Sequence, residues 1–216
     1  FFDDLDGAES ERFGAGLDVT LLPGELFAGL EASRRNIVVP DFTGTGDDVE
    51  LHQSDHSEQV YRAYLNWVPA APAWLPTLFR AGDWAFSLEV LHERFRREHL
   101  AGLEGLATRV ETTSVPFTVR YFSDTGVFLD FGATYLRQRV VLPATSSFDR
   151  TRDGVVLFDA AVGYRLPGRH GIVSFEVRNL FDEGFLYQDQ NIQIAEASTP
   201  RFIPARTFLL RVVLNF

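Results

Sequence analysis

The chain has 216 residues, of which 45% are apolar, and its formal net charge is -10 at pH 7. The apolar content excludes a disordered chain, and the acidic balance argues against a nucleic-acid partner, which would require a basic surface. The sequence contains no Cys, so a disulfide framework and thiol chemistry are excluded as well.

No segment has the length and the hydropathy of a transmembrane helix. The most apolar run, Trp67 to Phe79, is interrupted by Pro69, Pro72 and Pro76 and is shorter than the roughly 20 residues that a bilayer requires. The chain opens with the acidic stretch FFDDLDGAES and contains no Met, so no signal peptide is visible. We therefore expect a mature or internal segment of a longer polypeptide, which could cross a membrane only as a closed barrel.

Apolar and polar side chains alternate along most of the chain, and turn residues separate the alternating segments. This period of two predicts about nine strands. The segment 127–140 is the most regular, because Val127, Leu129 and Phe131 alternate with Asp130 and Gly132. In chain order the predicted strands are 12–22, 25–35, 58–68, 82–95, 107–122, 127–140, 154–165, 172–181 and 206–216.

The connections between these strands are alternately short and long. The short ones contain Pro23-Gly24, Ser123 to Gly126 and Pro167 to Gly171. The long ones are polar loops at 36–57, 96–105 and 143–152, and a loop of about twenty residues before the last strand. Such alternation is typical of outer-membrane barrels with short periplasmic turns and long extracellular loops. Only the connection 68–81 is longer than a periplasmic turn should be.

The last predicted strand, RTFLLRVVLNF, has one wholly apolar face and one face with Thr207, Arg211 and Asn215. Lipid requires such an apolar face, whereas a water-filled lumen accepts the polar one. Aromatic rings near the strand ends, at Trp67, Tyr121, Tyr164 and Phe13, are typical of the girdles at membrane interfaces. A soluble sandwich or lectin-like module is the alternative, and it predicts that the apolar faces are covered by protein.

The expected fold is therefore all-β, an antiparallel transmembrane β-barrel to which residues 1–216 contribute about nine C-terminal strands as part of a single domain. An odd number of strands does not close the usual single-chain barrel, so we expect further strands before Phe1. Outer-membrane lipid is the partner that this fold implies.

Two motifs in the last fifth of the chain carry a family resemblance. Val177 to Asp182 contains the run Asn179, Leu180, Phe181 and Asp182, and Pro204 to Phe208 leads into the last strand. Both resemble the C-terminal end of TonB-dependent outer-membrane receptors and of related plug-less barrels. Ala205 departs from the glycine that is usual in the family.

The resemblance implies a location in the outer membrane of a Gram-negative bacterium and the uptake or passage of a solute across it. It also implies that the barrel-assembly machinery reads an alternating C-terminal signal, and that a TonB-type energy transducer or other envelope proteins act as partners. The alternative is a barrel that serves as an anchor or as a structural or export component of a larger envelope complex. The assembly signal consists of Phe208, Leu210, Val212, Leu214 and Phe216.

Few residues suggest chemistry. His52, His56, His92 and His99 fall on the expected extracellular side, where imidazoles among carboxylates could contact a metal, although an acidic solvated loop has the same composition. No phosphate loop, nucleophile elbow or His-Glu-x-x-His motif is present, so we expect neither a cofactor nor an enzyme.

Charged residues on the expected lumen face are candidates to line a pathway or bind a plug, or else to neutralise one another. They are Asp130, Asp159, Arg165, Glu176, Arg178 and Arg211, together with Asp18, Glu31, Arg62, Asp83 and Glu89.

Overall fold

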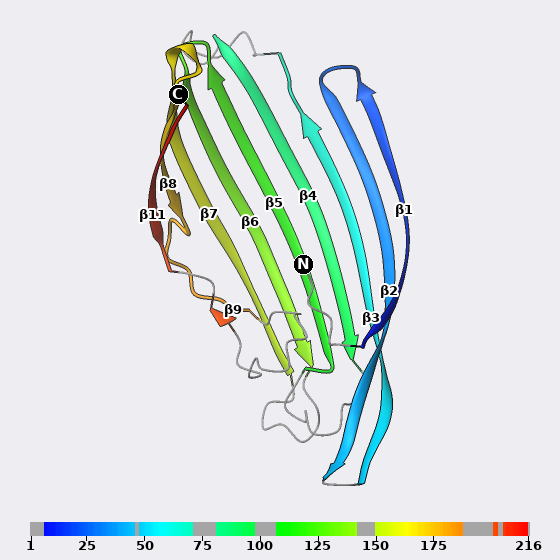
Figure 1. Ribbon diagram of the computed structural model, residues 1–216. Helices are drawn as coiled ribbons and strands as arrows, with labels where there is room; N and C mark the ends of the chain where they lie inside the picture. The colour runs from blue at the N-terminus through cyan, green and yellow to red at the C-terminus, as the bar shows by residue number, and fades with distance from the viewer. Residues whose placement is uncertain are drawn as a thin grey trace.

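The computed structural model describes residues 7–45, 48–70, 81–97, 107–141, 150–187, 201–202 and 205–215. Within these ranges the chain is all-β, with one antiparallel sheet of nine strands in the order β1-β2-β3-β4-β5-β6-β7-β8-β11 (Figure 1). The other described elements are β9 and β10, two strands of two residues each that pair only with each other, and the 3-10 turn η1. The bounds are β1 Glu9–Leu22, β2 Leu26–Thr45, β3 Asp48–Trp67, β4 Gly82–Arg97, β5 Arg109–Ser123, β6 Val127–Val141, β7 Arg150–Leu166, η1 Pro167–Arg169, β8 Gly171–Arg178, β9 Leu186–Tyr187, β10 Arg201–Phe202 and β11 Thr207–Leu214.

The sheet is an open meander. Each strand pairs with its neighbour in the chain, and β11 pairs with β8. β1 and β11 form the two edges and are not paired with each other in the described sheet. The all-β antiparallel architecture of the expectation is thus confirmed, whereas the described strands do not close into a barrel.

The short turns gather at one end of the sheet, which we call the turn end (Figure 1). At the β5–β6 turn, Gly126 has φ 95° and its N–H donates to the Ser123 carbonyl at 3.0 Å, a backbone conformation that favours glycine. The chain also finishes there, because Asn215 N–H donates to the His170 carbonyl at 2.9 Å. The opposite end, which carries the tip between β2 and β3, is the loop end.

The prediction of a polar loop at 36–57 was wrong, because these residues extend β2 and β3 into a long hairpin. Pairing continues without interruption from Arg35↔Glu58 to Thr45↔Asp48, and the hairpin projects beyond the sheet at the loop end (Figure 1). The sequence of this hairpin does not alternate between apolar and polar residues. Such alternation is not needed there, because the two strands are held by backbone hydrogen bonds and have no continuous apolar face to bury. The local signal was the β-branched run at 37–39, where Ile37 and Val39 are buried.

Other boundaries moved by a few residues. β7 begins at Arg150 and not at residue 154, and its first four residues extend the ladder with β6. β8 ends at Arg178 and not at residue 181, because Asn179 and Asp182 have φ values of 49° and 60° and leave the extended conformation. The described ends of the predicted loop before the last strand pair as β9 and β10.

Residues that face each other across an antiparallel ladder lie on the same side of the sheet, so the register defines two faces. On one face large apolar side chains are exposed, with Leu30 at 63% and Leu210 at 73%. The sandwich alternative predicted cover over 127–135, yet Phe131 is 42% exposed. The small buried cluster of Ala107, Val110 and Val140 lies at the loop end.

Candidate functional site

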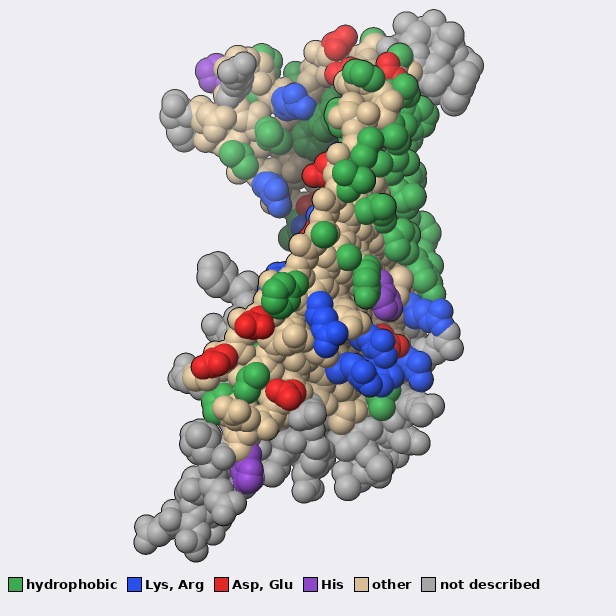
Figure 2. Space-filling model, turned by 90° about the vertical axis from the view of Figure 1, so that its right-hand side faces the viewer, with side chains coloured by type: hydrophobic (Ala, Val, Ile, Leu, Met, Phe, Trp, Pro, Cys, Tyr) green, Lys and Arg blue, Asp and Glu red, His purple; other side chains and the backbone are tan. Residues whose placement is uncertain are grey.

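The apolar face carries a belt without a charged residue across all nine strands. In β6 it runs from Val127 to Tyr135, which matches the roughly 9–11 residues of a tilted membrane-spanning strand. Figure 2 shows these side chains as a column along one side of the molecule. The belt comprises residues 13, 15, 17, 19 and 21 of β1, 26, 28, 30 and 32 of β2, 61, 63, 65 and 67 of β3, 84, 86, 88 and 90 of β4, 115, 117, 119 and 121 of β5, 127, 129, 131, 133 and 135 of β6, 156, 158, 160, 162 and 164 of β7, 173, 175 and 177 of β8, and 208, 210, 212 and 214 of β11.

Aromatic rings cluster where the belt meets the turn end. Trp67 lies 5.4 Å from Phe86, Trp84 lies 6.2 Å from Phe86, and Trp84 lies 5.0 Å from Tyr121, measured between ring centroids. Tyr164 lies on the same face and pairs with Val127. Trp67, Tyr121 and Tyr164 thus lie at the end expected from the sequence, and the register adds Trp84 and Phe86 to them.

The opposite face carries charged side chains in pairs. Arg62 and Glu89 are 2.7 Å apart across β3 and β4, and Arg120 and Asp130 are 2.7 Å apart across β5 and β6. These pairs are partly exposed, so each contributes no more than about 1 kcal/mol. Their arrangement neutralises charge on a face whose side chains are partly exposed.

All the charged residues expected to face a lumen occupy this polar face. They are Asp18 on β1, Glu31 on β2, Arg62 on β3, Asp83 and Glu89 on β4, Asp130 on β6, Asp159 and Arg165 on β7, Glu176 and Arg178 on β8, and Arg211 on β11.

One tyrosine on the polar face joins strands that are not neighbours. The Tyr64 hydroxyl, on β3, donates a hydrogen bond to the Asp18 carboxylate on β1. Its ring lies over Gly29 of the intervening β2, where an added Cβ would come within 2.5 Å of two ring carbons. A glycine is required at this position because the ring occupies the space of a side chain.

The first family-like motif forms a closed turn after β8. The Asn179 side chain accepts from the Glu183 N–H and donates to the Glu183 carbonyl, both at 2.9 Å. Its backbone N–H donates to Asp159 Oδ1 at 2.8 Å, and the Leu180 N–H donates to the Phe158 carbonyl at 2.7 Å. Asn179 is 4% exposed, so the turn is fixed to β7 through buried polar contacts.

This turn also holds the start of the last strand. The Arg206 N–H donates to Asp182 Oδ1 at 2.8 Å, and Arg206 Nη1 donates to the Leu180 carbonyl at 3.3 Å. The two motifs that resemble the receptor family therefore contact each other in space. Sequence reasoning treated them as separate signatures and did not predict their contact.

β11 completes the sheet edge. Phe208 stacks on Phe175 of β8 with ring centroids 6.2 Å apart, and the Arg206 guanidinium lies 6.0 Å from the Phe208 ring centroid. Five apolar residues of the strand are exposed, namely Phe208, Leu210, Val212, Val213 and Leu214, whereas Leu209 is half-buried. Phe216 lies outside the described residues, and the assembly-signal role of the segment stays a prediction.

The candidate metal-binding histidines are not brought together. His52 is exposed, His56 is buried on the polar face, and His92 lies on the apolar face, where it stacks with Tyr61 at 6.4 Å. His99 lies outside the described residues. In the part of the chain that the structure describes, no group of three or more acidic, His or Cys side chains could hold a metal ion.

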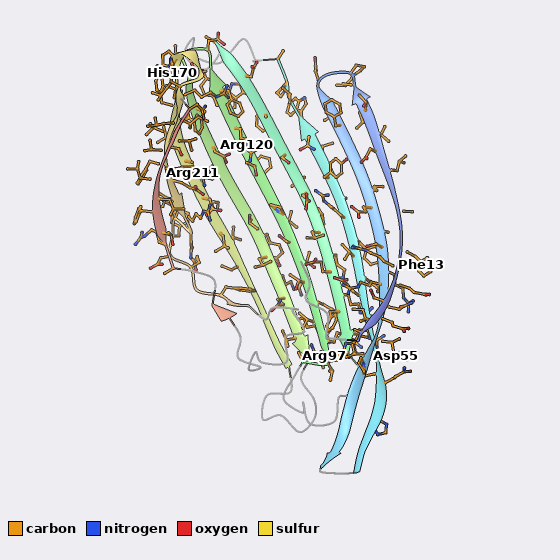
Figure 3. All side chains as sticks on the ribbon, in the orientation of Figure 1. Phe13, Asp55, Arg97, Arg120, His170 and Arg211 are labelled. Carbon is orange, nitrogen blue, oxygen red and sulfur yellow. The ribbon has the colours of Figure 1, made fainter. Side chains whose placement is uncertain are left out.

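His56 instead belongs to a buried cluster at the loop end. Its Nε2 is 3.3 Å from Ser54 Oγ, and its ring meets Phe95 edge-on at 6.0 Å. Burial, and then the positive charge of Arg97, lower the pKa of His56 to about 4, although Asp55 acts in the opposite direction. Figure 3 shows Arg97 and Asp55 at this end of the sheet. Near neutral pH His56 is therefore uncharged.

Among the residues that the structure describes, no helix is long and apolar enough to cross a membrane. Comparison of the chain with protein-family models, with curated proteins and with solved structures finds no match.

Proposed function

We propose that this sheet is part of the wall of a β-barrel in a bacterial outer membrane, and that the barrel takes up or passes a solute. The apolar face contacts lipid, and the polar face lines a water-filled interior. One observation carries the proposal. On one face the belt contains no charged residue across nine successive strands, whereas residues of the same strands that point to the other face form ion pairs. Lipid on one side and water on the other explain both faces at once.

A soluble protein would gain nothing from such a belt. Exposed apolar surface costs roughly 25 cal/mol per Å² in water, and contiguous apolar patches on soluble monomers rarely exceed a few hundred Å². The exposed belt residues extend from β1 to β11. Lipid removes this cost without a second protein layer.

These 216 residues contain no Cys, and any Cys elsewhere in the full-length native protein is first replaced by Ser. Single-Cys variants of the full-length native protein at Leu129, Asp130 and Phe131 alternate between the faces along one strand. In intact outer membranes a water-soluble maleimide should label Asp130→Cys, whereas it should label Leu129→Cys and Phe131→Cys only after the protein is unfolded in urea, because a thiol in hydrocarbon stays protonated and unreactive. Equal water-soluble labelling of all three, or recovery of the protein in a soluble fraction, would contradict the proposal.

Solute passage, rather than anchorage, is supported by the paired charges on the polar face and by the resemblance of the Asn179 to Asp182 motif to that of the receptor family. Ion pairs are not needed where a barrel interior is filled by apolar packing. A TonB-type transducer and the barrel-assembly machinery are the partners that the resemblance adds to the proposal.

Passage is tested separately by liposome swelling with sugars of graded size, using the purified full-length protein. Swelling that depends on solute size, and that changes when Arg120→Gln and Asp130→Asn are combined, supports a pathway along the polar face. Liposomes that stay impermeant, with the protein correctly inserted, contradict passive passage, and the absence of any solute binding by the same protein would favour the alternative of an anchor or structural component.

A further inference from the structure

Arginines gather on the apolar face directly beyond the belt. At the loop end of β4, β5 and β6 the belt stops at Val90, Val115 and Tyr135, and basic residues then appear on the same face. We call this set the arginine patch, and it consists of Arg94 and Arg96 on β4, Arg109 on β5, and Arg137 and Arg139 on β6.

The patch carries more positive charge than its neighbours neutralise. Glu111 lies at its centre, 3.2 Å from Arg94, 3.9 Å from Arg109 and 3.8 Å from Arg139. Among the described residues, Asp55 is a second carboxylate beside the patch, and two carboxylates do not compensate five guanidinium groups. The excess contrasts with the net charge of -10 for the whole chain, so general basicity of the protein does not explain it.

Next to the patch the surface is hollowed. A groove of about 820 Å³ is lined by Arg96, Arg109 and Arg139 of the patch, and also by Arg34, Arg97 and Asp55. Figure 2 shows basic side chains gathered at the end of the apolar column.

The distribution is one-sided. On the apolar face at the turn end, the residues that follow the belt are Gly82, Ser123 and Thr125. Among the side chains that the structure describes there, none is a lysine or an arginine. The nearby Arg165 lies on the polar face, with its guanidinium 5.1 Å from the Phe122 ring. One end of the belt therefore differs in charge from the other.

We infer that the arginine patch binds the phosphate groups of an anionic membrane amphiphile in the leaflet that the loop end reaches. The inference rests on the proposed membrane location. Guanidinium groups match phosphate oxygens with paired hydrogen bonds. Arg137 lies two residues past Tyr135, about 7 Å along the strand, and Arg94 and Arg139 lie one row further. The headgroups of the lipids that cover the belt would lie at this level. The acyl chains of the same molecule would then pack on Val90, Val115 and Tyr135.

The test compares lipid retained by the full-length protein after purification in a zwitterionic detergent. The patch variant combines Arg94→Gln, Arg96→Gln and Arg139→Gln. The matched control combines Arg12→Gln, Arg165→Gln and Arg211→Gln, which removes the same charge from the polar face. Each basic residue near a membrane surface strengthens binding of anionic lipid about fivefold, so the patch variant should lose affinity on the order of a hundredfold.

Bound lipid is quantified by native mass spectrometry and by total phosphorus, and insertion is measured in parallel by outer-membrane recovery and heat-modifiable mobility. Loss of lipid from the patch variant alone, with normal insertion, supports the inference. Equal retention by the patch variant, or an unmodified patch that holds inorganic phosphate but retains no lipid, overturns it. Failure of the unmodified protein to reach the membrane instead overturns the proposed function.

Discussion

The backbone N–H of Arg206 donates a 2.8 Å hydrogen bond to the carboxylate of Asp182, and this contact fixes where the last strand begins. Asp182 has φ 60°, and its own N–H donates to the Asn179 carbonyl at 2.9 Å. The turn after β8 and the start of β11 are therefore one unit, although the chain between them includes β9 and β10.

Substitution of Asp182 should weaken the attachment of β11. Asp182→Ala removes the acceptor and places a residue that disfavours positive φ, so we expect a loss of about 1–3 kcal/mol. Asp182→Asn keeps an oxygen acceptor and tolerates the backbone conformation, so its effect should stay within about 0.5 kcal/mol. The urea midpoint of heat-modifiable mobility measures both. Equal losses for the two variants would contradict the role given to the hydrogen bond.

Gly29→Ala should destabilise the sheet, because the added methyl group meets the Tyr64 ring and displaces its hydroxyl from Asp18. We expect a cost of about 1–3 kcal/mol, as for other overpacked sites. Gly132→Ala is the matched control on the same face, since its new Cβ would meet only Asp159 Cβ at 3.7 Å. The same urea titration should leave that control unchanged or slightly more stable. Indistinguishable midpoints would exclude the steric explanation.

Phe131→Arg places a charge in the belt and should lower stability by about 2–4 kcal/mol if the belt contacts the centre of a bilayer. Thr134→Arg adds the same side chain to the polar face of the same strand and should have little effect. Outer-membrane recovery of the full-length variants, with their heat-modifiable mobility, distinguishes the two. A polar-face variant as defective as the belt variant would indicate that strand β6 is sensitive to any bulky charge.

The loop-end hairpin should become less stable in acid. The pKa of His56 is about 4 in the folded protein and 6.5 without burial, so the unfolded hairpin binds the proton more tightly. The contribution of neutral His56 to stability is therefore complete above about pH 6.5 and is lost as the pH falls towards 4. Hydrogen exchange of the β2–β3 amides should accelerate between pH 7 and pH 4.5, after correction for intrinsic rates.

His56→Gln should remove this acceleration, since glutamine does not titrate. His170→Gln, at the opposite end of the sheet, should retain it. A pH profile that is the same in all three proteins would show that another group controls the hairpin.

The sequence by itself determined the two faces of the sheet and the end at which the short turns lie. Side chains alternate across any extended backbone, so the period of apolar residues along 127–135 assigned Phe131 to one face and Asp130 to the other without knowledge of the partner strands. Turn residues such as Pro23 and Gly24 gave the short connections for an equally local reason.

Only the tertiary structure decided which residues meet across strands. Register places Tyr64 over Gly29 and brings Glu111 between Arg94 and Arg139. The alternating pattern assigns each residue to a face, but it does not say which residue of the next strand lies opposite when the connection between the strands is long. The extension of β2 and β3 through 36–57 was missed for a related reason: a hairpin that projects from the sheet needs no apolar face, so its sequence lacks the periodic signal that revealed the other strands.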